Sequence, residues 1–146
     1  MKKLILIALL IVGCEKNSTE PEVHPLVGIW EQTEITITFT SGTLNGTTMT
    51  VPVGEITEMG ASTWIFGEDG VASMTSTDAA TGTTDTDAGT WSATGNKLTI
   101  IPTDDGEETV IFDFTISGNI LTISYEYDGT ADGEDSFSTE IKFEKQ

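Results

Sequence analysis

The stretch VIFDFTISGNILTISYEY, residues 110–127, decides the fold class of this chain. Apolar and polar side chains alternate on both sides of Gly118-Asn119. Alternation places every second side chain on one face of a strand, and Gly and Asn accept the positive φ of a tight hairpin. The stretch therefore predicts two antiparallel strands joined by a short turn. Their apolar rows are Val110, Phe112, Phe114 and Ile116, then Leu121, Ile123, Tyr125 and Tyr127.

The same pattern extends through the chain from Leu26 onward, and no window shows the three-and-four spacing of an amphipathic helix. Turn signals such as Glu68-Asp69-Gly70 and Gly95-Asn96 separate the alternating runs. We therefore predict an all-β domain, an antiparallel up-and-down meander of eight or nine strands between Val27 and Glu144. Expected strands include 47–53, 63–67, 71–77, 89–94, 97–103, 107–117 and 120–128, with further apolar rows at Ile35, Ile37 and Phe39 and at Phe137, Ile141 and Phe143.

A meander of this length with one apolar face is expected to close into a barrel, because closure removes the exposed sheet edges. About eight strands leave room inside for packed side chains or for one small ligand. Two regions are predicted as long loops. They are the part of 41–60 outside the strand and the run from Asp78 to Asp87.

Charge excludes one class of partner. The chain has 24 acidic residues against 6 basic ones, all lysine, for a formal net charge of −18. Nucleic-acid binding depends on neutralising phosphates with Lys and Arg, so we expect no nucleic-acid partner. Anionic membrane surfaces also repel such a protein. Any membrane attachment therefore requires an anchor.

The N-terminus predicts such an anchor. Lys2 and Lys3 precede an apolar run that ends in Gly13 and then Cys14, the only cysteine. A charged start, a short apolar run and a small residue are typical of a signal peptide, here residues 1–13. Ile11-Val12-Gly13-Cys14 resembles a bacterial lipobox, which implies lipidation of Cys14 after cleavage before it. An ordinary signal peptide that happens to end in cysteine is the alternative.

If the lipobox is real, the protein sits in the cell envelope and contacts the membrane through its acyl chains. Residues 14–25 then form the lipidated cysteine and a flexible tether, because the segment is polar and contains Pro21 and Pro25. Residues 26–146 form the folded domain. Glu15 is not the aspartate that retains some lipoproteins at the inner membrane, so the outer membrane is favoured.

Three motifs occur in order along the folded domain. They are Gly28-Ile29-Trp30, the run from Trp64 to Gly70, and the run from Gly89 to Ile100, which contains Gly-Thr-Trp-Ser and Gly-Asn-Lys-Leu-Thr-Ile. In this order they resemble the lipocalin-like lipoproteins of bacteria. The resemblance implies a lipocalin-like barrel over 26–146, and we expect this barrel to bind a small apolar molecule without catalysis. Structural roles are expected for Gly28, Trp30, Gly89 and Trp91, with Trp30 plugging the barrel. Lipocalins often stack a late arginine on this tryptophan and end in a helix; this chain has no arginine and no clear C-terminal helix.

Aromatic side chains dominate the predicted interior and are the candidate ligand contacts. They either line a cavity for an apolar ligand or simply fill the barrel. The first reading describes a carrier or sensor. The second describes a module that acts through loops 41–60, 78–88 and 128–135. The candidate ligand-binding residues are Phe39, Trp64, Phe66, Phe112, Phe114, Tyr125 and Tyr127, with Phe137 and Phe143 also expected inside.

Catalytic and metal chemistry find little support. The single histidine, His24, falls in the expected tether, and a Ser-His-Asp arrangement needs a fixed imidazole. A zinc site with His or Cys ligands would need more such residues. Neither acidic stretch, 85–89 or 128–135, has the spacing of a calcium loop. We therefore expect no enzyme activity, no metal site and no cofactor. A hydrolytic enzyme with paired carboxylates stays as a third interpretation, which would require acidic side chains to converge in one cleft.

Overall fold

The protein is an antiparallel β-structure. The computed structural model describes residues 22–53, 61–104, 106–131 and 133–146. Within these ranges no helix has the length and apolar character needed to cross a membrane. The nine described strands confirm the predicted all-β class and strand number. They are β1 (Gly28–Phe39), β2 (Thr48–Pro52), β3 (Ser62–Phe66), β4 (Val71–Thr77), β5 (Thr84–Thr94), β6 (Lys97–Pro102), β7 (Val110–Ser117), β8 (Ile120–Tyr127) and β9 (Phe137–Lys145).

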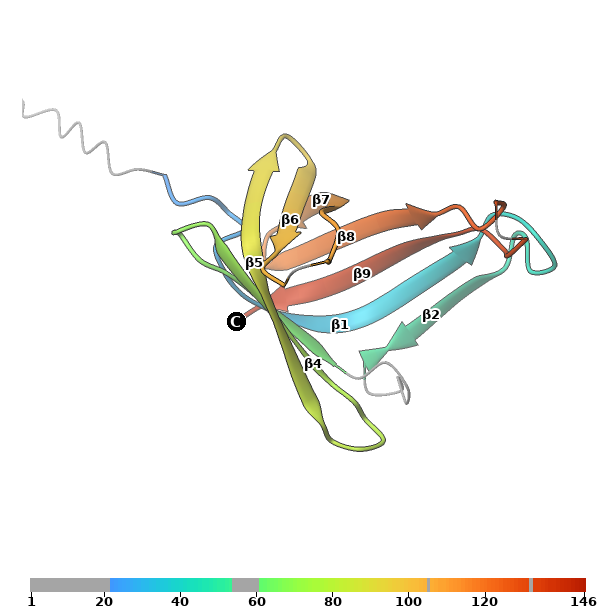
Figure 1. The fold of residues 1–146 in the computed structure, drawn as a ribbon, viewed down its shortest axis with the longest axis horizontal. Helices are drawn as coiled ribbons and strands as arrows, with labels where there is room; N and C mark the ends of the chain where they lie inside the picture. The colour runs from blue at the N-terminus through green and yellow to red at the C-terminus, as the bar shows by residue number, and fades with distance from the viewer. Residues whose placement is uncertain (1–21, 54–60, 105, 132) are drawn as a thin grey trace, which may run out of the picture.

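Eight of these strands close into a barrel. From β3 to β9 each strand pairs with the next in sequence, and β9 returns to pair with β1 from Trp30–Lys145 to Phe39–Phe137. The first part of β1 pairs with β3, whereas its second part pairs with β2. β2 is thus an extra strand beside β1, and Figure 1 shows β8, β9, β1 and β2 running alongside one another. This topology confirms the expected meander and its closure.

The core gathers at one end of the barrel, which we call the closed end. The buried cluster draws one or two inward side chains from almost every strand, as the alternating rows predict. Fully burying a large apolar side chain contributes about 1.5–3 kcal/mol, so this cluster accounts for much of the stability. Its members are Leu26, Trp30, Trp64, Phe66, Ala72, Leu98, Ile100, Phe114, Leu121, Ile123 and Phe143.

The prediction of a loop from Asp78 to Asp87 is wrong for the second half of that run. β5 begins at Thr84 and pairs with β4 as far as Thr77–Thr84. Threonines face each other across this ladder, and the Oγ1 atoms of Thr75 and Thr86 lie 3.2 Å apart. Cross-strand threonine pairs stabilise strands, and this contribution outweighs the turn-forming tendency of the aspartates. Only 78–83 forms the turn.

The loops at the other end of the barrel, the open end, do not form one platform. Thr40 N donates to Ser136 O at 2.8 Å, and Ser136 N donates to Ser41 Oγ at 2.8 Å. These bonds join the 40–47 and 128–136 loops. The 78–83 turn projects away from them at the tip of the β4–β5 hairpin (Figure 1). The predicted surface of three loops is therefore split, and residues 54–60 of it lie outside the described residues.

Candidate functional site

Trp30 closes one end of the barrel. Its side chain is fully buried, and its indole Nε1 donates to Leu26 O at 2.7 Å. The ammonium of Lys145 lies 5.2 Å from the centroid of the Trp30 ring, within cation–π range. Lys145 Nζ also donates to Pro25 O at 3.2 Å. Lysine thus occupies the position over the tryptophan where lipocalins often have an arginine.

Two glycines permit close approaches within the barrel. Gly28 has a φ of 138°, and a Cβ there would lie 2.7 Å from Lys145 Cε. A Cβ on Gly89 would lie 2.6 Å from the carbonyl oxygen of Ile101. Real Cβ atoms do not approach backbone oxygens this closely. Both positions therefore need glycine, one for its conformation and one for the distance to β6.

Trp91 packs between the core and the start of the described chain at the closed end. Its indole Nε1 donates to Gly67 O at 3.0 Å, and its ring lies edge-on to Phe66 at 5.4 Å. His24 packs on the same indole at 5.5 Å, and its Nδ1 accepts from Leu26 N at 3.2 Å. We expected nothing to hold this histidine. His24 and Pro25, at the end of the expected tether, instead contact the barrel through Trp91 and Lys145.

The open end contains a cavity of about 380 Å³. Its apolar lining continues the core, since Trp64 and Ile100 belong to the buried cluster and Met74 and Phe112 pack against it. Ligand pockets in proteins are of about 300–1,000 Å³ and mostly apolar. The cavity therefore has the size and chemistry for one small apolar molecule. Its apolar lining residues are Trp64, Met74, Ile100, Pro102, Val110 and Phe112.

Three carboxylates complete the lining of this cavity. Asp87 comes from β5, and Glu107 and Glu108 come from the loop before β7. All three side chains are exposed to solvent. Since the apolar residues adjoin the core and the acidic ones are exposed, the cavity has an apolar floor and an acidic rim.

The seven aromatic residues predicted as ligand contacts separate into three groups. Trp64 and Phe112 line the cavity. Phe66 and Phe114 are buried in the core at the closed end. Phe39, Tyr125 and Tyr127 extend toward the open-end loops, where both tyrosines are 36% exposed. The residues predicted as one interior set are therefore packed in the core at one end of the barrel and line a cavity at the other.

Tyr127 contacts the 128–136 loop through its hydroxyl and packs on Phe137 through its ring. Its hydroxyl donates to Glu134 Oε2 at 2.9 Å, and its ring lies 5.0 Å from that of Phe137, which in turn packs edge-on against Phe39. The hydrogen bond to Glu134 and the negative charge of that carboxylate raise the pKa of Tyr127 above its usual 10.0. Tyr127 therefore stabilises the 128–136 loop and is not one of the residues that line the cavity.

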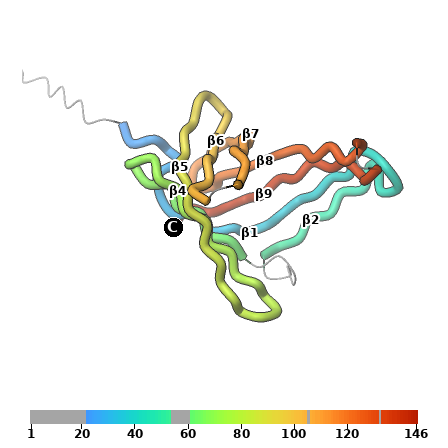
Figure 2. The backbone as a smooth tube through the Cα atoms, viewed as in Figure 1, coloured from blue at the N-terminus to red at the C-terminus, as the bar shows by residue number. Residues whose placement is uncertain are grey.

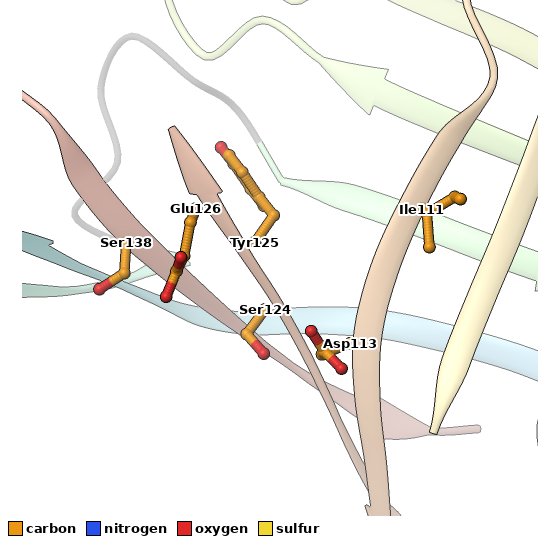
Figure 3. A pocket seen from close by; sticks show the side chains of 6 residues that line it. All are labelled: Ile111, Asp113, Ser124, Tyr125, Glu126 and Ser138. Carbon is orange, nitrogen blue, oxygen red and sulfur yellow. The ribbon is translucent and has the colours of Figure 1, made fainter. Parts of the chain in front are cut away.

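A second hollow opens on the outside of the barrel, between β7 and β8. The β7–β8 ladder ends at the pair Asp113–Ser124, beyond which β7 pairs only with β6. Figure 3 shows Ile111 on β7 and Tyr125 on β8 standing well apart above this pair. The slit measures about 260 Å³ and is lined mainly by polar side chains. Across the gap, the ring centroids of Phe112 and Tyr125 lie 6.0 Å apart.

Sequence reasoning missed several cavity residues. Met74, Ile100, Pro102 and Val110 are not aromatic and were not singled out as ligand contacts. Strand parity could have found them, because Met74 pairs with Trp64 across β3–β4 and Val110 pairs with Ile100 across β6–β7. The positions of Glu107 and Glu108 had no signal in the sequence, since they depend on the loop before β7, whereas Asp87 pairs with Met74 across β4–β5.

The acidic stretch 128–135 forms a hydrogen-bonded turn. Asp128 Oδ1 accepts from Thr130 Oγ1 at 2.6 Å, from Thr130 N at 3.0 Å and from Ser136 Oγ at 3.3 Å. These bonds, chiefly those from Thr130, hold the pKa of Asp128 below its usual 3.8. In the part of the chain that the structure describes, no three His, Cys, Asp or Glu side chains are placed to hold a metal ion.

Cys14, the residue predicted to be lipidated, lies outside the described residues.

Comparison with known proteins agrees with this geometry. The family model described as "Lipocalin-like domain" matches residues 26–123. The chain belongs to the lipocalin-like domain family. A comparison with curated proteins finds no match.

Solved structures resemble the same lipocalin-like domain. A lipocalin-like protein from Bacteroides uniformis has a TM-score of 0.51 and 20% identity, over 83% of this chain and 98% of its own. An uncharacterized protein from Bacteroides eggerthii has a TM-score of 0.50 and 12% identity, over 83% of this chain and 99% of its own. At these identities the likeness establishes a shared fold alone.

Proposed function

We propose that this protein is a lipid-anchored lipoprotein of the cell envelope whose lipocalin-like barrel binds one small apolar molecule at its open end, without catalysis. The observation that carries the proposal is the cavity of about 380 Å³ with its apolar floor. The lipocalin-like fold supports it, because small barrels of this kind hold a single ligand inside.

The packing around the cavity favours a preformed site. The ring centroid of Trp64 lies 5.8 Å from that of Phe112 and 5.2 Å from that of Phe143, so the indole packs against two aromatic neighbours. Rigid walls lower the conformational entropy lost on binding. A ligand that covers these rings also removes apolar surface from water, at about 25 cal/mol per Å². Together these effects favour an apolar guest over water.

A pair of substitutions on one strand tests the proposal. Val110 lines the cavity, whereas its neighbour Ile111 lines the outer slit. Val110→Trp should fill the cavity and abolish calorimetric binding of 1-naphthylmethanol, a neutral aromatic probe. Ile111→Trp adds an equally large ring on the other face of β7 and should leave binding intact. Equal binding by both variants and the parent would contradict a site inside the barrel.

The alternative is a module that acts through its surface. Its support is the hydrogen-bonded pair of loops, 40–47 and 128–136. This alternative predicts no saturable binding of apolar probes by the parent protein. It also predicts that shortening the 128–136 loop removes capture of a partner from envelope extracts.

The anchor is tested separately from the barrel. Cys14→Ser should release an intact, soluble domain when cells are fractionated, since two or more acyl chains are needed for stable attachment. The released domain should bind the probe as the parent does. Continued membrane fractionation of the variant would contradict the lipid anchor and leave the binding proposal standing.

A further inference from the structure

We infer that the ligand of the open-end cavity is an amphipathic cation: an apolar ring system or short chain that carries a protonated amine or a quaternary ammonium. This inference rests on the proposed function and deepens it, because it assigns the charge of the guest. It depends on one juxtaposition, the apolar floor around Trp64 and Phe112 beneath the three rim carboxylates of Asp87, Glu107 and Glu108.

Among the residues that the structure describes, no basic side chain lines the cavity to balance these carboxylates. The lysines in the described ranges are engaged elsewhere. Lys97 Nζ lies 2.8 Å from Asp113, Lys142 pairs with Glu34, and Lys145 lies over Trp30 at the closed end. A cationic guest would supply the missing positive charge, whereas an anionic guest such as a fatty acid would meet three like charges.

The two parts of the lining suit the two parts of such a guest. An apolar body gains from burial on the floor, where Trp64 and Ile100 adjoin the core. A charged head would lose too much hydration there, but at the exposed rim it keeps contact with water while it approaches the carboxylates. The net charge of −18 adds a long-range attraction for cations.

Three probes with one apolar body separate these contributions: 1-naphthylmethylammonium, neutral 1-naphthylmethanol and anionic 1-naphthylacetate. Calorimetry on the protein at low ionic strength should rank them in that order. We expect the cation to bind about tenfold more tightly than the neutral probe, a ratio within reach of a few exposed charges. The preference should shrink in 1 M salt, where charges are screened within about 3 Å.

The rim is tested with a charge-matched control. Glu107→Gln/Glu108→Gln should remove most of the preference for the cation, because only Asp87 then remains at the rim, while binding of the neutral probe is retained. Glu31→Gln/Glu68→Gln removes the same charge from exposed residues that do not line the cavity, and should retain the preference. Equal loss in both double variants would overturn the rim as the site of recognition, because only the overall charge would then matter.

The outcomes also separate this inference from the proposed function. Equal affinity for cation and neutral probe, lost in Val110→Trp, would overturn the inference and support an apolar site. If none of the three probes bound, both would fail. Tightest binding of the anion would overturn the inference alone.

Discussion

Lys145 lies over Trp30, with its ammonium nitrogen 5.2 Å from the centroid of the indole ring. The contact joins the last residue of β9 to the third residue of β1, which are also backbone partners in the barrel seam. The C-terminus and the start of β1 consequently lie close together (Figure 2), where Gln146 N donates to Ile29 O at 3.0 Å. Lys145 thus takes part both in the β1–β9 seam and in the packing around Trp30 at the closed end.

Loss of this lysine should destabilise the domain. Lys145→Met keeps the aliphatic chain but removes the cation–π contact and the hydrogen bond to Pro25, so we expect the free energy of unfolding to fall by about 1 kcal/mol. Lys145→Arg should retain most of the free energy of unfolding, because a guanidinium can stack on the same ring. Urea unfolding measures both. No difference between the methionine variant and the parent would mean that the contact contributes nothing.

Gly89→Ala should be more damaging than a glycine substitution in open space. The new Cβ would meet the Ile101 carbonyl at 2.6 Å, and the backbone of β6 must shift to relieve it. We expect a loss of about 2 kcal/mol. Gly82→Ala is the comparison, because nothing lies within 4 Å and only its φ of 69° costs energy, about 1 kcal/mol. Thermal unfolding should show Gly89→Ala as the less stable; the reverse order would argue against the close approach.

Thr139→Val should stabilise the protein. The Thr139 hydroxyl is buried on β9 and makes no hydrogen bond within the described residues. A buried polar group without a partner costs about 1–3 kcal/mol, and valine has nearly the same shape. We expect the free energy of unfolding to rise by about 1 kcal/mol, whereas Thr139→Ser should lower it by loss of a methyl group. Destabilisation by valine would show that the hydroxyl has a partner, such as a bound water.

The 128–136 loop should respond to acid through Asp128. Its hydrogen bonds, above all that from the Thr130 hydroxyl, lower its pKa below 3.8. A lowered folded-state pKa contributes stability above the unfolded pKa, and this contribution is lost as the pH falls from about 3.8 through the lowered value. Thr130→Ala should raise the pKa of Asp128 toward 3.8 in an NMR titration, and Thr130→Ser should not. An unchanged pKa in the alanine variant would assign the shift to the bonds from Thr130 N and Ser136 Oγ.

Strand alternation and turn residues were enough to predict the class, the strand number and the closure. The strand predicted at 71–77 has those bounds in β4, because Asp69-Gly70 ends one alternating run and begins the next. The start of β5 could not be predicted, since its threonines are stabilised by partners on β4 and not by their own neighbours. Local patterns do not contain such cross-strand pairs.

The candidate site was predictable only in part. Trp64 and Phe112 follow from alternation, and both line the cavity. Which end of each row is packed and which is hollow depends on where neighbouring strands diverge, as β7 does from β8 after Asp113–Ser124. Two of the three rim carboxylates, Glu107 and Glu108, depend on the course of the loop before β7. Position along an alternating row therefore predicts the face of a residue but not whether a ligand can reach it.

The central claim is that an apolar molecule binds inside the open end of the barrel. Methyl NMR of the protein titrated with 1-naphthylmethanol tests it most directly, because Met74 and Val110 carry methyl groups in the cavity lining and Ile111 carries them in the outer slit. We expect saturable shifts at Met74 and Val110, with Ile111 unchanged. Shifts confined to Ile111, or no saturable shift at any of the three, would contradict it.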